Sequence, residues 1–259
     1  MELAGKVALV TGAGSGIGEA AALRMADEGA DIILVSRSEE ELEEVARKIR
    51  PKGRKAIVHA ADIADDEAMS RVFALAREEF GALDILFANA GVNGVWAPID
   101  ELKPGEWDDT MRVNLRGTFL TVHYAVPLMR DKGGSIIITA SINGTRTFTS
   151  AGASAYATSK AGQLALGKML ALELAKNRIR VNVICPGAIA TEISENTVKR
   201  DTEEAKVPSV FPEGKVPLTG GKPGSAEQVA DLVVFLASER ASHITGTPVW
   251  IDGGESLLV

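Results

Sequence analysis

Tyr156 and Lys160 stand four residues apart in the segment Ser154–Leu174. In a helix, this spacing places both side chains on one face, one turn apart. A free phenol has a pKa of about 10, and a cation one turn away favours its ionised form, so we expect Lys160 to lower the pKa of Tyr156. Such a phenol acts as a general acid or base near physiological pH. The spacing alone is weak, because it is also typical of solvated helix faces.

The segment that carries this pair is expected to be a buried helix. Small residues around Tyr156 leave room for a flat ligand, and the residues after Lys160 are apolar almost all round the helix. Burial against a sheet and burial between subunits both agree with this pattern. The apolar residues are Leu164, Leu166, Met169, Leu170, Leu172 and Leu174.

A glycine-rich loop near the start of the chain predicts a phosphate-binding turn. It follows an apolar strand expected over Lys6–Thr11 and precedes a helical segment. Glycine permits a tight turn and lets backbone N–H groups at a helix N-terminus approach a pyrophosphate. The loop has the pattern T-G-x-x-x-G-x-G and contains Gly12, Ser15, Gly16, Ile17 and Gly18.

The end of the second expected strand, Asp31–Arg37, indicates which dinucleotide is bound. About 20 residues beyond such a loop, an acidic residue would bind the ribose hydroxyls and select NAD. Ser36 and Arg37 stand there instead, and an arginine suits a 2′-phosphate through its charge and its planar donors. We therefore expect NADP(H) to be preferred, with NAD(H) possible because Glu39 and Glu40 are close by.

Strands and helices alternate along the chain, which predicts a single α/β domain over 1–259 with a doubly wound, mainly parallel sheet of about seven strands. Ligands bind at the carboxyl ends of such strands, where Asn89, Gly91 and Ser141 are expected. One long helix is expected over 106–130, and an irregular loop over 92–105. Residues 192–224 are long enough for a substrate loop. The other expected strands are 55–60, 84–89, 135–140, 179–185 and 248–251.

The composition excludes several classes of function. The 259 residues carry a net charge of −7 without a basic patch, which argues against nucleic-acid binding. The apolar runs are too short to span a bilayer, and the three histidines are too scattered for a metal site. The lone Cys185 allows no internal disulfide and fits a reducing compartment, so we expect a cytoplasmic protein.

These motifs together resemble those of the short-chain dehydrogenase/reductase family, over nearly the whole chain from Thr11 to Gly254. The resemblance rests on TGAGSGIG at 11–18, Asp62-Ile63, NAG at 89–91, Asn114, Ser141, YATSK at 156–160 and PGAIAT at 186–191. It implies that Tyr156 donates the proton in carbonyl reduction and that Lys160 holds the nicotinamide ribose and depresses the phenol pKa. It also implies that Ser141 orients the substrate oxygen, and that the backbone of Asn114 holds a water linking Lys160 to solvent.

The resemblance also implies the cofactor contacts. The glycine loop would hold the pyrophosphate, and Arg37 would be the sole obvious anchor of a 2′-phosphate, because Ser15 stands where many NADP-using members carry a basic residue. Ala88 replaces an asparagine that is common in the family, which could loosen a structural bond. The remaining contacts would be Asp62 and Ile63 to the adenine, Asn89, Ala90 and Gly91 along the ribose, and Pro186, Gly187, Ile189 and Thr191 around the nicotinamide.

The expected function is transfer of a hydride between a nicotinamide cofactor and a ketone or secondary alcohol. The alternatives are a non-catalytic dinucleotide-sensing module and a purely structural protein, and the set Asn114, Ser141, Tyr156 and Lys160 favours the enzyme. 3-Oxoacyl-thioester reductases, sugar dehydrogenases and steroid dehydrogenases all fit. The family implies a homotetramer. The substrate pocket is expected between 92–98, 142–155 and 192–224, with Trp96, Phe148, Val210 and Phe211 as apolar walls and Arg146, Thr147 and Lys215 as polar contacts.

Overall fold

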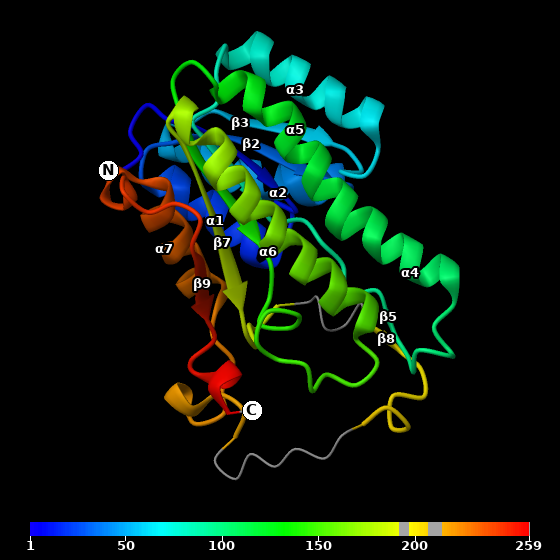
Figure 1. Ribbon diagram of the computed structural model, residues 1–259. Coiled ribbons are helices and arrows are strands. Elements are labelled where there is room, and N and C mark those ends of the chain that lie inside the picture. Colours follow the sequence, from blue (N-terminus) through cyan, green and yellow to red (C-terminus); the bar gives the residue numbers. More distant parts are fainter. Residues whose placement is uncertain (192–196, 207–213, 259) are drawn as a thin grey trace.

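A seven-stranded sheet forms the centre of the protein in a computed structural model, which describes residues 1–191, 197–206 and 214–258 (Figure 1). The strand order is β3-β2-β1-β4-β6-β7-β9, and all pairings are parallel. The predicted doubly wound sheet is therefore confirmed. The strands are β1 (Val7–Thr11), β2 (Asp31–Ser36), β3 (Ala56–Ala60), β4 (Ile85–Ala88), β6 (Gly134–Thr139), β7 (Ile179–Pro186) and β9 (Pro248–Ile251).

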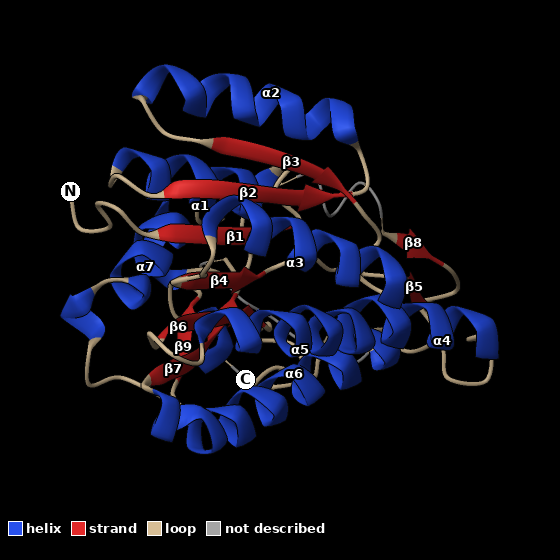
Figure 2. Cartoon of the chain, turned by 90° about the horizontal axis from the view of Figure 1, so that it is seen from above, coloured by secondary structure: helices blue, strands red, loops and turns tan. Residues whose placement is uncertain are grey.

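Helices cover both faces of this sheet (Figure 2). Alternate strand residues point to opposite faces, so Ala8 and Val10 of β1 belong to one apolar core while Leu9 belongs to the other. Helices α1 (Gly16–Asp27), α2 (Glu39–Ile49) and α7 (Ala226–Ala237) pack on the first core. Helices α3 (Asp66–Phe80), α5 (Gly117–Met129) and α6 (Ser154–Leu174) pack on the second.

The long helix predicted over 106–130 is interrupted by a π-helical turn. It starts earlier than expected, as α4 (Pro104–Met111), because proline suits the first turn of a helix, where no N–H partner is needed. The π turn spans Arg112–Arg116 and carries Asn114, and α5 follows it directly. Single π turns inside α-helices are frequent at functional sites.

A second, two-stranded sheet was not expected from the sequence. It pairs β5 (Val95–Trp96) in parallel with β8 (Val198–Lys199). The prediction of unstructured loops over 92–105 and 192–224 is wrong at these residues. Strands of two residues are too short to show an alternating pattern. Their pairing ties the start of the expected substrate loop to the segment that follows β4.

Helix α6 has the predicted bounds, Ser154–Leu174, but it is not buried all round. Ala171 and Leu174 lie in the core, whereas Met169 is 72% exposed and Leu172 is 84% exposed. The expected burial is therefore wrong for the outer face of α6 within this chain. Among the residues that the structure describes, none of the helices combines the length and apolar character needed to cross a membrane.

Candidate active site

The carboxyl ends of the central strands surround a pocket of about 620 Å³. Parallel strands bring their carboxyl ends to one edge of the sheet, so segments far apart in the sequence meet there. Ser141 lines this pocket together with most of the predicted cofactor residues. Those residues are Gly12, Ser15, Gly16, Ile17, Ser36, Arg37, Asp62, Ile63, Asn89, Ala90, Gly91, Tyr156, Lys160, Pro186, Gly187, Ile189 and Thr191.

The glycine loop has the geometry that a closely approached phosphate requires. Gly12 has a φ of 66°, and a Cβ there would lie 2.9 Å from the Cα of Ala90. A Cβ on Gly18 would lie 1.9 Å from the carbonyl oxygen of Gly12, so Gly18 lets α1 pack directly beneath the loop. Helix α1 begins at Gly16, and Gly16 and Ile17 line the pocket, so the N-terminus of this helix lies at the pocket. The loop therefore fits the pyrophosphate of a dinucleotide.

Asn89 joins the ends of three strands. Its backbone N–H donates to Thr11 Oγ1 at 3.1 Å, and its Nδ2 donates to the Thr11 carbonyl at 3.3 Å. Thr139 Oγ1 donates to Asn89 Oδ1 at 3.1 Å. Asn89 thus ties β4 to β1 and to β6. The Asn89 side chain is held by hydrogen bonds to β1 and β6, and it also lines the pocket.

Asp62 is fixed at the far end of the pocket by Arg112, a partner that sequence analysis missed. Arg112 Nη1 donates to Asp62 Oδ2 at 2.9 Å, and the Ala64 N–H donates to Asp62 Oδ1 at 2.9 Å. Burial raises the pKa of the Asp62 carboxyl, but these two hydrogen bonds together with the nearby guanidinium charges outweigh burial and lower it. Asp62 is therefore a carboxylate at neutral pH, able to accept hydrogen bonds from an adenine amino group.

Glu41 places an acidic group beside the predicted anchor of a 2′-phosphate. A Cβ on Gly14 would lie 2.7 Å from Glu41 Oε2 and 3.2 Å from Ser36 Oγ. Glu41 lines the pocket with Ser36 and Arg37. The sequence pointed to Glu39 and Glu40 as the nearby acids. The structure instead brings Glu41 to the pocket. Glu41 lies in the first turn of α2, directly after Glu39 and Glu40.

The Tyr156–Lys160 pair is on one face of α6, as predicted, but its electrostatics differ from expectation. Lys160 Nζ lies 5.6 Å from the centroid of the Tyr156 ring and donates to the Thr139 carbonyl at 2.9 Å. Lys160 is only 4% exposed, and burial lowers its pKa to about 8. Burial also raises the pKa of Tyr156, and only the hydrogen bond with Ser141 opposes this. The expected lowering of the phenol pKa is therefore wrong for this structure, because burial raises it by more than the Ser141 hydrogen bond lowers it.

Ser141 follows β6 and is buried beside the phenol. Its Oγ accepts a hydrogen bond from the Asn143 N–H at 3.1 Å, which leaves the hydroxyl proton available to another acceptor. Ser150 and Ser154 lie away from this pocket and line a second hollow. The structure thus brings Ser141, and neither of the other two serines, to Tyr156.

Asn114 does not line the main pocket but supports its wall. Its side chain pairs with Val92 in both directions, with Oδ1 accepting at 2.8 Å and Nδ2 donating at 2.9 Å, and Nδ2 also donates to Ser159 Oγ at 3.0 Å. Its carbonyl, expected to hold a water, accepts from Thr118 Oγ1 at 2.7 Å and from Gln163 Nε2 at 2.9 Å. Sequence analysis missed Gln163, although a polar amide on an otherwise apolar helix was a usable signal.

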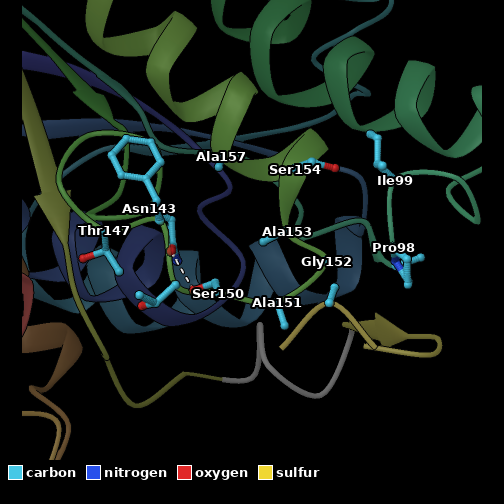
Figure 3. Close-up of a pocket in the computed structure, with 14 residues that line it drawn as sticks. Pro98, Ile99, Asn143, Thr147, Ser150, Ala151, Gly152, Ala153, Ser154 and Ala157 are labelled. Carbon is cyan, nitrogen blue, oxygen red and sulfur yellow. Dashed lines mark hydrogen bonds between the residues drawn. The ribbon is translucent and has the colours of Figure 1, made fainter. Parts of the chain in front are cut away.

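The structure brings some of the residues expected on the substrate side close to Tyr156 and to α6. The Trp96 ring lies 6.1 Å from the Tyr156 ring, and Phe148 and Thr147 line a hollow of about 360 Å³ next to the N-terminus of α6 (Figure 3). Arg146 was expected to contact substrate, but its guanidinium stacks 3.5 Å from the Trp250 ring centroid instead. Lys215 is not among the residues that line either hollow. Val210 and Phe211 lie outside the described residues.

Comparison with known proteins identifies the family. A family model described as enoyl-(acyl carrier protein) reductase matches residues 12–256. The chain belongs to the short-chain dehydrogenase/reductase family. The 3-oxoacyl-(acyl-carrier-protein) reductase FabG of Thermotoga maritima is 35% identical over 255 residues, which cover 98% of this chain and 99% of that protein.

Solved structures of the family agree with this assignment. A 3-ketoacyl-ACP reductase from Sinorhizobium meliloti is 53% identical with a TM-score of 0.93, covering 98% of this chain and 100% of that one. A 3-ketoacyl-(acyl-carrier-protein) reductase from Brucella melitensis, complexed with NADH, is 31% identical with a TM-score of 0.86, covering 98% of this chain and 99% of that one. The protein is therefore an NAD(P)-dependent oxidoreductase that interconverts ketones and secondary alcohols.

Proposed function

We propose that Tyr156 is the general acid in carbonyl reduction and the general base in alcohol oxidation. The observation that carries this proposal is that Tyr156, Ser141 and Lys160 line the same pocket as the glycine loop. The raised pKa of Tyr156 keeps the phenol protonated at neutral pH, so it has a proton to give to a substrate oxygen. A dinucleotide-sensing module would have no use for this acid beside a serine and an ammonium.

The other residues position the substrate and the cofactor around this phenol. Ser141 donates its hydroxyl proton to the substrate oxygen and orients it toward Tyr156. Lys160 binds the nicotinamide ribose through its ammonium, and Asn114 holds the wall between β4 and α6. When bound, the nicotinamide exchanges a hydride with the substrate carbon. In reduction the carbonyl carbon gains the hydride and its oxygen gains the Tyr156 proton, which gives the alcohol.

We propose that NADP(H) is preferred over NAD(H), by a small margin. Arg37 lines the pocket and supports binding of a 2′-phosphate through charge and hydrogen bonding. The Glu41 carboxylate beside Gly14 and Ser36 opposes a second negative charge there. At about 4 Å in a solvated setting, each such interaction is worth roughly 1 kcal/mol, so the two nearly balance and NAD(H) remains usable.

A 3-oxoacyl thioester is the substrate class that we favour, and a sugar is the second candidate. The hollow beside the N-terminus of α6 has apolar walls from Ala97, Ile99 and Phe148, which suit an acyl chain. Several hydroxyls and amides line the same hollow, among them Asn143, Thr147 and Ser150, and they support the sugar alternative. We also propose that residues 192–224 form the substrate loop within one domain.

We further propose that the chain acts as a cytoplasmic homotetramer. Three large apolar side chains on neighbouring helices support an oligomer: Phe119 on α5 is 50% exposed, and Met169 and Leu172 on α6 are more exposed still. Contacts with another copy would remove this surface from water. The buried free thiol of Cys185 fits a reducing compartment.

A panel of carbonyls and alcohols, assayed with NADPH and NADH, tests this proposal. The panel holds an acetoacetyl thioester, a cyclic ketone, a hexose and a steroid alcohol. Tyr156→Phe should lower kcat by at least about 10³-fold while cofactor affinity, measured by nucleotide fluorescence, stays within a few fold. Tyr124→Phe, at the chain's other tyrosine, is the matched control. Full activity of Tyr156→Phe would reject the assignment, and NADH kinetics better than NADPH would reject the cofactor preference.

A further inference from the structure

Gln163 is a buried polar residue that contacts Asn114, and the family resemblance assigned it no role. It lies on α6, three residues after Lys160, and its side chain is fully buried at 0% exposure. Nε2 donates to the Asn114 carbonyl at 2.9 Å and to Thr118 Oγ1 at 2.7 Å. Thr118 Oγ1 in turn donates to the same carbonyl at 2.7 Å. The two side chains therefore hold one backbone oxygen between them.

The Asn114 carbonyl accepts from side chains on two different helices. Thr118 on α5 and Gln163 on α6 both donate to it, and two such donors match the two lone pairs of a carbonyl oxygen. This carbonyl lies in the π turn Arg112–Arg116, where the regular hydrogen-bond ladder of the helix is displaced. Gln163 and Thr118 thus donate to the oxygen at which the family pattern led us to expect a water.

The oxygen of the Gln163 amide makes glutamine a less stable choice than an apolar residue at this position. Its Oε1 is buried and has no hydrogen-bond partner among the described residues. Leaving a buried acceptor unpaired is destabilising, and a methionine of similar length would avoid that cost. The amide is therefore retained for what its Nε2 does.

Movement of Asn114 would reach both members of the Tyr156–Lys160 pair. Asn114 Nδ2 donates to Ser159 Oγ, which donates to the Tyr156 carbonyl at 2.7 Å. On the other side, a Cβ on Gly91 would lie 3.1 Å from Asn114 Oδ1 and 3.5 Å from Lys160 Nζ. Asn114 is therefore linked through the Ser159 hydroxyl to the Tyr156 carbonyl, and its side chain lies near the Lys160 ammonium.

We propose that Gln163 is a positioning residue, which holds the Asn114 carbonyl and the π turn and so sets the geometry of Tyr156 and Lys160. This inference rests on the proposed function, because the reaction is what the geometry serves.

Two substitutions separate this role from simple packing. Gln163→Met keeps the volume but removes both donated hydrogen bonds, and we expect kcat to fall about tenfold at all pH values while the KM for cofactor changes less than about twofold. Gln163→Glu keeps the shape. Its buried carboxyl donates one hydrogen bond while protonated and repels the Asn114 carbonyl once ionised. Its kcat should therefore approach the wild-type value at low pH and fall as pH rises.

Thr121→Val is the matched control, because Thr121 is equally buried and donates to the Gly117 carbonyl at 2.8 Å on α5, away from the pocket. Its pH profile should match that of the wild type even if its urea midpoint falls. The proposal is overturned if Gln163→Glu shows the wild-type pH profile, or if Gln163→Met loses stability but keeps kcat. An inactive wild type, or an active Tyr156→Phe, would instead count against the proposed function.

A structural measurement tests the role of Gln163 even if the proposed reaction is wrong. In a crystal structure of Gln163→Met, we expect an ordered water within hydrogen-bond distance of the Asn114 carbonyl, at the place of the lost amide. A crystal structure of the wild-type protein should show Gln163 Nε2 there. A water at this carbonyl in the wild type, with Gln163 turned away, would overturn the inference whatever the activity.

Discussion

The buried ammonium of Lys160 makes the stability of the protein depend on pH. Burial lowers its pKa from 10.5 to about 8, so between these values the folded chain has released a proton that the unfolded chain still holds. Stability rises with pH wherever the unfolded state binds more protons. The penalty for burying the charge, about 3 kcal/mol for a shift of this size, is fully present below pH 8 and is relieved as pH rises toward 10.5.

The free energy of unfolding should therefore climb with pH relative to a variant without this group. Between pH 7 and pH 9 we expect the difference between wild type and Lys160→Met to change by about 1 kcal/mol in favour of the wild type. Urea denaturation at several pH values measures it. Burial raises the pKa of Cys185 to about 11, so this thiol lowers the stability of the folded protein as pH rises above 9. Cys185 is present in both proteins. Parallel curves for the two proteins would contradict a buried, titrating Lys160.

Spacing in the sequence predicted which residues meet, but not how their protons behave. The four-residue interval correctly placed Tyr156 and Lys160 on one helical face. The direction of the Tyr156 pKa was wrong, because desolvation depends on what the rest of the chain packs around the phenol. Gln163 was missed for a related reason. Its polarity among apolar neighbours was a signal, but its partner is a backbone oxygen on another helix, and no side-chain pattern in the sequence marks such a partner.

Among the elements, the small β5–β8 sheet has its own clamp. Arg200 follows β8 and donates to both Glu106 carboxylate oxygens, at 2.9 Å each, while its backbone N–H donates to the Trp96 carbonyl at 2.9 Å. These hydrogen bonds lower the pKa of Glu106 to about 2. The clamp joins the start of the expected substrate loop to α4, and it fixes Trp96 beside the Tyr156 ring.

Breaking this clamp should weaken substrate binding more than cofactor binding. We expect Arg200→Ala to raise the substrate KM roughly threefold to fivefold, since a partly exposed pair contributes little, while the dissociation constant of the cofactor stays unchanged. Steady-state kinetics and nucleotide fluorescence measure the two quantities. Arg71→Ala, which removes an exposed ion pair on α3, is the control. Equal effects on both ligands would show that the clamp supports the whole fold rather than the substrate side.

Long elements could be predicted from the sequence, and short ones could not. The bounds of α6 and the seven main strands follow from apolar runs and glycine breaks, within a residue or two. The π turn at Arg112–Arg116 leaves no mark, because residues such as Val113 and Leu115 continue the apolar pattern of α4 and α5. Strands β5 and β8 exist only through their mutual pairing and the Arg200 clamp, which are contacts across about a hundred residues of chain.

At the scale of the whole molecule, the outer face of α6 remains apolar and exposed. Leu172 is 84% exposed and Met169 is 72% exposed, although the opposite face of the same helix lies in the core. A single exposed apolar side chain needs no explanation, but Met169 and Leu172 lie three residues apart on one helix, and Phe119 on α5 is also half exposed. This is the observation that supports the proposed tetramer.

Leu172→Asp should therefore reduce the size of the assembly. A carboxylate in an apolar interface loses its hydration, so we expect the mass measured by light scattering during gel filtration to fall from four chains to two or one. Leu75→Asp, on the exposed side of α3, is the control, since Leu75 is 42% exposed and far from this surface in the chain. An unchanged mass for Leu172→Asp would place the interface elsewhere or exclude it.

The π turn has a consequence for how the two halves of its helix are oriented. Each residue of an α-helix turns the chain by about 100° about the helix axis. The extra residue of the π turn therefore changes which way the side chains of α4 point relative to those of α5. The α5 side chains can therefore face the sheet while those of α4 face the end of α6 and β5. Removing one residue from Arg112–Arg116 would restore a regular helix and turn one of these halves away from its neighbours.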